Sequence, residues 1–266
     1  MNPFDSVIAD GVRPSMAQDY SYFRHQCEVD FQSAEGLAIL DGWAERWAEK
    51  FRGAQKKYGK IVCDLSGGAD SRACLVLALN AGIKDSLVLH VKNPKFERIP
   101  ERVEHDERDF AISSLIAGRL GLPMTHTKIY EYLRIPRITG LGSCFKTADC
   151  GITQDYRLER APQEIRAAAE KWLSDHTDAD VMDRKQMAFE IAYYQWHDTY
   201  KIERENRKYP VLAPYTDPEI KRLKSKGYRL WQFFMQRYCP EMLDYPIEGR
   251  GFIGDIIRKQ EKEENI

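Results

Sequence analysis

A glycine-rich turn between two apolar runs places the strongest constraint on how this chain can fold. The turn is the string Ser66-Gly67-Gly68-Ala69-Asp70-Ser71, which follows the apolar run 60–65 and precedes the apolar run 73–79. This order predicts a buried strand, a tight turn and then a helix. Because two adjacent glycines let the backbone bend sharply and approach a ligand closely, we expect the turn N–H groups and the helix N-terminus to form an anion site.

The polar side chains of this turn favour a phosphate ligand. Ser66 and Ser71 add hydroxyl donors, and the carboxylate of Asp70 is suited to hold Mg²⁺ against phosphate oxygens. The turn has neither the Gly-Lys-Ser/Thr of a Walker loop nor the G-x-G-x-x-G of a dinucleotide-binding fold. The alternative to a phosphate-binding turn is an ordinary glycine-rich turn from a strand to a helix. That alternative does not explain why these polar residues occur together between two apolar runs.

Strand and helix patterns alternate on both sides of the turn. The expected helices cover about 34–55, 70–81 and 109–120, and the expected strands cover about 60–65, 86–91 and 124–129. Alternation of this kind predicts an α/β fold with a parallel sheet. Ligands bind beyond the carboxyl ends of such strands, so we expect the turn after Leu65 and the segment after Val91 to meet at one edge.

Composition limits the partners of the chain. Its 266 residues carry 40 Lys and Arg against 41 Asp and Glu, so bulk charge gives no argument for nucleic acid or membranes. No apolar stretch approaches the ~20 residues of a membrane span, and the N-terminus lacks the regions of a signal peptide. We therefore expect a cytoplasmic protein. Among six cysteines, Cys144 and Cys150 are the one close pair, no C-x-x-C occurs, and the role of the pair is left open.

The string 66–71 resembles the SGGxDS signature of the PP-loop ATP pyrophosphatase superfamily, whose members cleave ATP between the α- and β-phosphates. The form that continues with Arg72 is similar to the synthetase domain of asparagine synthetases. Segments 105–122, 205–212 and 238–243 resemble other parts of that domain. The resemblance implies a HUP/Rossmann-like parallel sheet, with ATP and Mg²⁺ as ligands.

The chain departs from that family at three places. Asn2 stands where the family has its catalytic cysteine, and the glutaminase domain is missing, so we expect no glutamine hydrolysis. The second phosphate-side motif, Gly-x-Gly-x-Asp-Glu, is reduced to Gly140-Leu141-Gly142, and the nearest acid is Asp149. The family's Arg-Pro-Lys is absent, and the nearest cation is Arg250. These departures leave the second half of the family's reaction open.

The patterns and the resemblance together divide the chain into four parts. These are an irregular arm over 1–30, a PP-loop nucleotide-binding α/β core over 31–133, an active-site loop or insertion over 134–160, and a mostly helical C-terminal region over 161–266. In the last part, helices are expected over about 161–173, 183–204 and 228–238.

The resemblance also implies roles for particular residues. Pyrophosphate would lie on Ser66, Gly67, Gly68, Ala69, Asp70 and Ser71, and adenine would lie against the second strand at Leu89, His90 and Val91. Asp70 would be the first Mg²⁺ ligand and Asp149 a second. The expected catalytic residues are Asp70, Arg250 and Lys146. Apart from the resemblance, Arg134, Arg137 and Lys146 are expected to contact substrate phosphate or carboxylate, because they are cations of the expected active-site loop. For His90, a core position is the alternative.

These roles predict an ATP-dependent ligase or amidotransferase-like enzyme. A small-molecule carboxylate or carbonyl would attack the α-phosphorus, pyrophosphate would leave, and ammonia or an amine would displace AMP. Two alternatives stay open. One is a PP-loop enzyme that modifies tRNA or other nucleic-acid bases, which the aromatic and arginine residues of the last third favour. The other is a degenerate nucleotide-binding protein without turnover, which the altered motifs favour.

Overall fold

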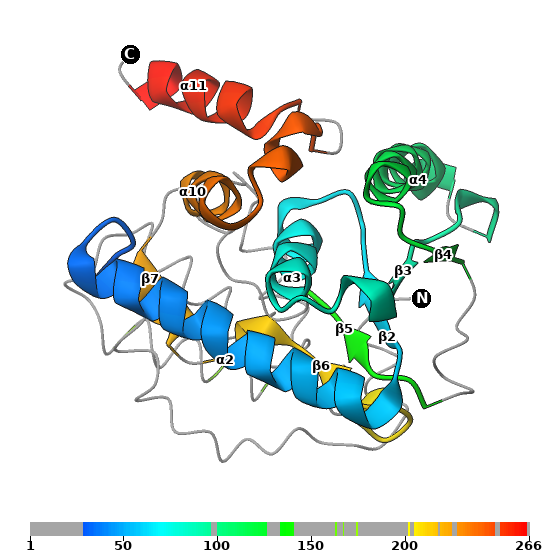
Figure 1. Ribbon diagram of the computed structural model, residues 1–266. Helices are drawn as coiled ribbons and strands as arrows, with labels where there is room; N and C mark the ends of the chain where they lie inside the picture. Colours follow the sequence, from blue (N-terminus) through cyan, green and yellow to red (C-terminus); the bar gives the residue numbers. More distant parts are fainter. Residues whose placement is uncertain are drawn as a thin grey trace.

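A five-stranded parallel sheet forms the centre of the computed structural model, which describes residues 29–96, 100–126, 134–140, 205–217, 219–224, 228–247 and 251–264 and a few isolated positions between 163 and 202 (Figure 1). The strands are β2 (Ile61–Asp64), β3 (Leu87–His90), β4 (Met124–Thr125), β5 (Arg137–Ile138) and β6 (Val211–Leu212), in the order β4-β3-β2-β5-β6. All four neighbouring pairs are parallel. The predicted α/β class with a parallel sheet is confirmed.

Three helices lie between or before these strands in the sequence. They are α2 (Ala34–Tyr58), α3 (Ala69–Asn80) and α4 (Pro100–Leu120). The first turn of α2 is capped by Ser33, whose hydroxyl accepts a hydrogen bond from the Gly36 N–H at 3.0 Å. Residues 73–78 of α3 are fully buried because α3 packs between β2 and the helices α2 and α10 (Arg229–Tyr238). An apolar helix without a polar face is what such a position requires.

The C-terminal part of the chain packs back on these helices. After α10 come the short helix η8 (Pro240–Asp244) and α11 (Ile253–Glu264), which lies at the end of the molecule beyond α10 in Figure 1. The strand β1 (Val29–Asp30) pairs in parallel with β7 (Leu223–Lys224). Segments from both ends of the described chain therefore pack together, and their buried side chains belong to one hydrophobic core.

The two faces of the sheet carry different side chains. Ile61, Cys63, Leu89 and Ile138 are fully buried and belong to the main core with the side chains of α3. Because side chains alternate along a strand, the neighbouring positions face the other side. That second face carries the small apolar cluster of Val62 and Tyr209, with Ile135 and Val211 against it, together with several charged groups.

Two expected boundaries differ from the structure. The helix expected from about residue 109 begins at Pro100, since proline suits a first helical turn. Its charged residues 104, 105, 107 and 108 are exposed and interrupt the apolar period. Within 134–160, expected to be a loop, residues 137 and 138 form the sheet strand β5, and the C-terminal region contributes β6 and β7. Two-residue strands are too short to show an alternating pattern.

The helix expected over 228–238 is confirmed as α10. The helices expected over 161–173 and 183–204 lie outside the described residues except at isolated positions, as does most of the expected arm over 1–30. In the part of the chain that the structure describes, no helix has the length and apolar character needed to cross a membrane.

Candidate functional site

The turn after β2 lies where the order of the sheet reverses. From β2 the chain first adds β3 and β4 on one side and later adds β5 and β6 on the other. The end of β5 packs on the start of α3, because a Cβ atom added to Gly140 would lie 3.3 Å from the Ser71 nitrogen. Ligands of open parallel sheets bind beyond the carboxyl ends of the strands at such a reversal. The structure thus places the sequence-predicted turn at the position where an α/β protein binds its ligand.

The two serines of the turn hold each other in place. The Ser66 N–H donates to the Ser71 hydroxyl at 3.1 Å, and the two hydroxyl oxygens are also 3.1 Å apart. The N-cap of α3 is Gly68, which provides no side-chain acceptor for the first N–H groups of the helix. Those N–H groups require a ligand or water. Hydroxyls and uncapped helix N–H groups at one place are the features on which the predicted anion site depends, and anion binding there stays a prediction.

Gly67 is the residue of the turn that tolerates no side chain. Its φ of 64° lies in the left-handed region, where residues with a Cβ atom are strained. A Cβ atom added there would also lie 2.8 Å from Oδ1 of Asp109, on α4. Close packing of α4 against the turn therefore explains why glycine occupies this position.

Asp70 lies in the first turn of α3, where a carboxylate interacts favourably with the helix dipole. It is partly buried, and its backbone carbonyl accepts a hydrogen bond from the Tyr215 hydroxyl at 3.0 Å. The described residues include no group of three His, Cys, Asp or Glu side chains that would hold a metal ion by itself. One carboxylate beside a phosphate site nevertheless fits Mg²⁺, which proteins commonly bind through one or two carboxylates together with substrate phosphates.

The predicted adenine-binding residues lie within the sheet. Leu89 and Val91 are buried, and their N–H groups donate to the carbonyls of Pro123 at 2.8 Å and Thr125 at 3.1 Å. The His90 carbonyl accepts from the Leu65 N–H at 3.0 Å. These backbone groups already serve the sheet ladder, so adenine recognition at this strand stays a prediction.

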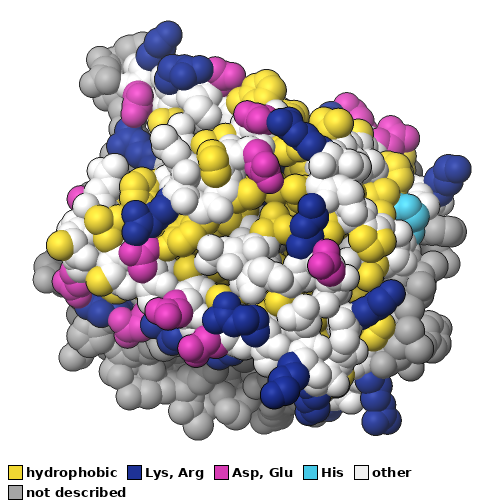
Figure 2. All heavy atoms as spheres, in the orientation of Figure 1, with side chains coloured by type: hydrophobic (Ala, Val, Ile, Leu, Met, Phe, Trp, Pro, Cys, Tyr) yellow, Lys and Arg dark blue, Asp and Glu magenta, His cyan; other side chains and the backbone are white. Residues whose placement is uncertain are grey.

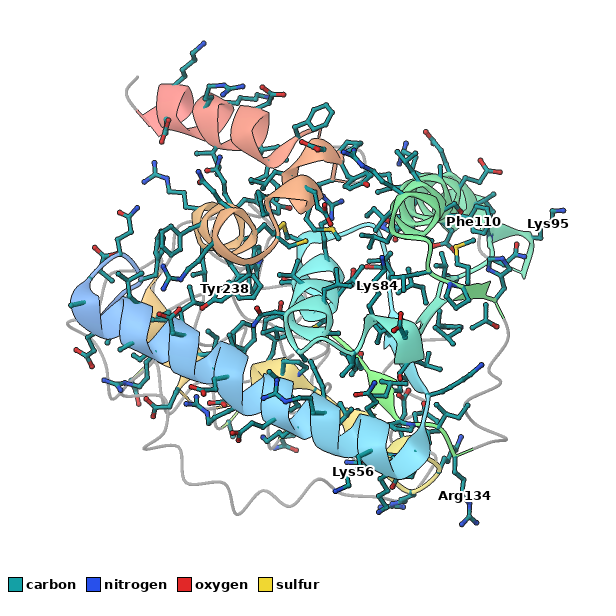
Figure 3. All side chains as sticks on the ribbon, viewed as in Figure 1. Lys56, Lys84, Lys95, Phe110, Arg134 and Tyr238 are labelled. Atoms are coloured by element: carbon teal, nitrogen blue, oxygen red, sulfur yellow. The ribbon has the colours of Figure 1, made fainter. Side chains whose placement is uncertain are left out.

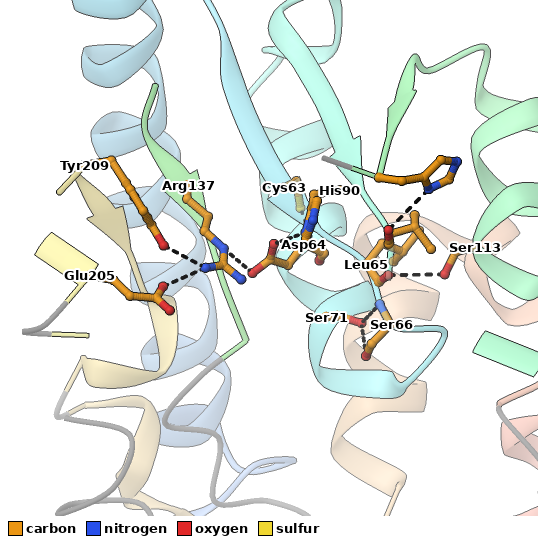
Figure 4. Close-up of polar contacts among 12 residues, drawn as sticks. Cys63, Asp64, Leu65, Ser66, Ser71, His90, Ser113, Arg137, Glu205 and Tyr209 are labelled. Carbon is orange, nitrogen blue, oxygen red and sulfur yellow. Dashed lines mark hydrogen bonds and ion pairs between the residues drawn. The ribbon is translucent and has the colours of Figure 1, made fainter. Parts of the chain in front are cut away.

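A polar network on the second face of the sheet was not predicted from the sequence (Figure 4). Oδ1 of Asp64 lies 3.1 Å from Nδ1 of His90, and Nε of Arg137 donates to Oδ2 of Asp64 at 2.6 Å. The same guanidinium donates to Glu205 at 2.6 Å and to the Tyr209 hydroxyl at 2.9 Å. Burial is the main cause that raises the pKa of the Tyr209 phenol. The two carboxylates compensate the charge of Arg137, and its contact to a substrate stays a prediction.

Arg72 ties the turn to the C-terminal part of the chain. It is fully buried, and burial lowers the pKa of its guanidinium to about 10. Its two terminal nitrogens donate to four carbonyl groups, which belong to Gly67 at 3.0 Å, Met242 at 3.1 Å, Tyr245 at 2.8 Å and Pro246 at 2.8 Å. The guanidinium therefore fixes the peptide of Gly67 relative to η8. The sequence marks this arginine only as part of the family resemblance, because three of its four partners are 170 to 174 residues away.

The remaining predicted residues lie elsewhere. Arg134 precedes β5, at the amino edge of the sheet, is exposed and points outward at the periphery of the molecule (Figure 3). It is therefore on the opposite edge from the turn, contrary to the expected substrate contact. Lys146, Asp149 and Arg250 lie outside the described residues, and so do Cys144 and Cys150.

The fold and the site define an α/β protein with a glycine-rich strand-to-helix turn at the reversal point of a parallel sheet. Comparisons with protein-family models, curated proteins and solved structures found no match to this chain.

Proposed function

We propose that the chain is an ATP-dependent adenylating enzyme that resembles the synthetase domain of asparagine synthetases. It binds ATP at the turn 66–71 and activates a carboxylate or carbonyl substrate as its AMP adduct, with release of pyrophosphate. Ammonia or an amine then attacks the activated carbon and displaces AMP, which forms a C–N bond. The SGGxDS string carries the choice of reaction class.

One structural observation supports this choice more than any other. The string lies at the reversal point between β2 and β5, with the hydroxyls of Ser66 and Ser71 3.1 Å apart at the N-terminus of α3. The Ser71 hydroxyl is buried and also serves the turn itself, since it accepts from the Ser66 N–H at 3.1 Å and donates to the Gly68 carbonyl at 3.3 Å. Ser66 is exposed. Its hydroxyl and the first N–H groups of α3 are the donors that a leaving pyrophosphate needs, since negative charge accumulates on its oxygens as the bond to the α-phosphorus breaks.

The chain's own residues would orient the triphosphate. Helix N–H groups and the two serine hydroxyls bind the pyrophosphate portion, and Arg72 keeps the Gly67 peptide in position. Asp70 is the described residue that would hold Mg²⁺, whose charge neutralises phosphate oxygens when it is bound. Lys146, Asp149 and Arg250 stay predicted contributors to this reaction.

The proposal is tested by identifying the products formed from ATP. The protein is incubated with ATP, Mg²⁺ and pools of carboxylic acids, other carbonyl compounds and amines, and nucleotides are quantified by mass spectrometry. We expect AMP and pyrophosphate in equal amounts, formed only in pools that contain a substrate acid or carbonyl compound. Formation of ADP and phosphate instead would contradict the proposal.

The two alternative functions predict other outcomes of the same experiment. AMP formation that requires tRNA would indicate a base-modifying enzyme, and tight ATP binding without AMP in any pool would indicate a protein without turnover. Basic and acidic side chains are interspersed over the face shown in Figure 2, with hydrophobic side chains between them. That face therefore has no uniformly basic surface of the kind that binds nucleic acid.

A further inference from the structure

A lysine outside the glycine-rich turn lies next to the proposed phosphate site. Lys92 follows β3 at the carboxyl edge of the sheet, and its Nζ lies 2.7 Å from Oδ2 of Asp106 on α4. The Asp106 side chain is only 7% exposed, whereas the Lys92 side chain is 55% exposed. A buried carboxylate thus fixes a lysine whose side chain still reaches solvent.

Helix α4 fixes where this ammonium group lies relative to the turn. The Ser113 hydroxyl donates to the Leu65 carbonyl at 3.3 Å, where β2 ends. Asp109, one turn earlier on α4, contacts Gly67. Asp106 precedes Asp109 by three residues, so it lies on the same helix face about 5 Å further along the axis. The ammonium group bound by Asp106 therefore lies just beyond the turn, on the side away from the strands.

Carboxylates outnumber basic groups around the turn, where the half-exposed His105 lies 3.5 Å from Oδ1 of Asp106 and 3.9 Å from Oδ2 of Asp109. One imidazole cannot balance three carboxylates and a pyrophosphate, so a further cation is needed there. Asp70, Asp106 and Asp109 all lie on or beside the turn, and pyrophosphate adds further negative charge. The buried Arg72 guanidinium is bonded to four carbonyls. In the described segments that directly follow β2, β3, β5 and β6, the lysines are Lys92 and Lys95, and Lys95 points outward in Figure 3.

We propose that Lys92, oriented by Asp106, binds the β- and γ-phosphates of ATP and the pyrophosphate that leaves. An ammonium group has three donors, so contacts to Asp106 and to a phosphate oxygen are compatible. The proposal rests on the proposed function, because it assigns a further binding residue to the same site. Lys92 also adds positive charge at the phosphates. The C-terminal lysine of the resembled family is absent from this chain, so Mg²⁺ would otherwise have to supply that charge.

Calorimetric titration of the full chain with MgATP, pyrophosphate and AMP tests the role of Lys92. In Lys92→Gln we expect affinity for ATP and pyrophosphate to fall about ten- to a hundredfold, as for the loss of one charged hydrogen bond. AMP lacks the β- and γ-phosphates, so its affinity should stay unchanged. Lys92→Arg should retain most of the affinity. The matched control is Lys84→Gln, an exposed lysine just before the amino end of β3, and it should bind all three ligands as the wild type does.

Each result separates this inference from the proposed function. If the wild type binds ATP and pyrophosphate but Lys92→Gln binds them equally well, the role of Lys92 is wrong and the proposed function stands. If Lys92→Gln also loses AMP affinity in proportion, the effect is structural and the inference is again overturned. Lys92→Gln/Asp106→Asn, which leaves no unpaired buried carboxylate, must show the same selective loss. A wild-type chain that binds neither ATP nor pyrophosphate overturns both claims.

Discussion

At the scale of the residue, the turn depends on a glycine that lacks a Cβ atom and on cysteine thiols that are fully buried. Gly67 has a positive φ and lies against Asp109, so a methyl group at this position would be both strained and crowded. Cys63 and Cys74 are fully buried beside the turn, and burial raises the pKa of both thiols. Backbone geometry and burial, more than charge, therefore decide which side chains fit at these three positions.

Gly67→Ala should lower the free energy of unfolding by about 1–3 kcal/mol, the usual cost of a strained left-handed residue. The measurement is urea unfolding followed by circular dichroism. Gly53→Ala is the matched control, since Gly53 lies within α2, five residues before its last residue, with no atom within 4 Å of an added Cβ. There the same change should stabilise the protein by about 0.5–1 kcal/mol. Equal effects at both glycines would contradict the described geometry of the turn.

The free energy of unfolding should fall as pH rises above about 9, because the Cys63 thiol ionises there in the unfolded chain but not in the folded one. The folded state then binds more protons than the unfolded state, so alkaline pH favours unfolding. Urea unfolding at pH 8 and pH 9.5 measures the difference. In Cys63→Ala the difference should become smaller; an unchanged difference would show that this thiol ionises equally in both states.

At the scale of the element, the sequence predicted the helices and strands that have a periodic apolar pattern. It did not predict the short strands or the ion pairs between residues far apart in the chain. The apolar period of α2 and the glycine turn before α3 are local signals, and both elements lie within a few residues of their expected bounds. β5 was missed because two residues show no alternation. The bonds from Arg137 to Asp64 and Glu205 join residues 73 and 68 positions apart, and nothing local in the sequence indicates such a pairing.

Arg137→Gln should destabilise the protein by about 3 kcal/mol, since it leaves the partly buried carboxylates of Asp64 and Glu205 without their shared cation. Arg134→Gln provides the control, because Arg134 is exposed and lies three residues earlier; its effect should stay within about 0.5 kcal/mol. Chemical denaturation of both variants measures the difference. A similar small effect of both substitutions would show that the network does not stabilise β2 against β5 and β6.

At the scale of the whole molecule, aromatic side chains join the two ends of the described chain. Trp43 of α2 lies 5.7 Å from Tyr215 and 5.5 Å from Phe234 of α10 between ring centroids. Its indole N–H donates to the Pro214 carbonyl at 2.9 Å. Together with the Arg72 bonds to η8, these contacts hold the C-terminal part against the helices that flank the turn. We infer that the described segments unfold as one unit.

Trp43→Ala should lower the free energy of unfolding by about 3–5 kcal/mol. Hydrogen exchange read by mass spectrometry should show α2 and α10 losing protection together. Trp43→Phe keeps an aromatic ring but loses the bond to Pro214 and part of the buried indole volume, so its cost should exceed the ~1 kcal/mol of that bond and stay below the cost of Trp43→Ala. Loss of protection in α2 alone would contradict a single cooperative unit.

The central claim, that the turn 66–71 activates ATP, is tested most directly by exchange of labelled pyrophosphate into ATP. The assay compares the wild type with Asp70→Ala and with Asp85→Ala, which removes an exposed carboxylate before the amino end of β3. With a substrate acid present, we predict exchange in the wild type and in Asp85→Ala, and a loss of about a hundredfold or more in Asp70→Ala. Exchange at the wild-type rate in Asp70→Ala would contradict the claim.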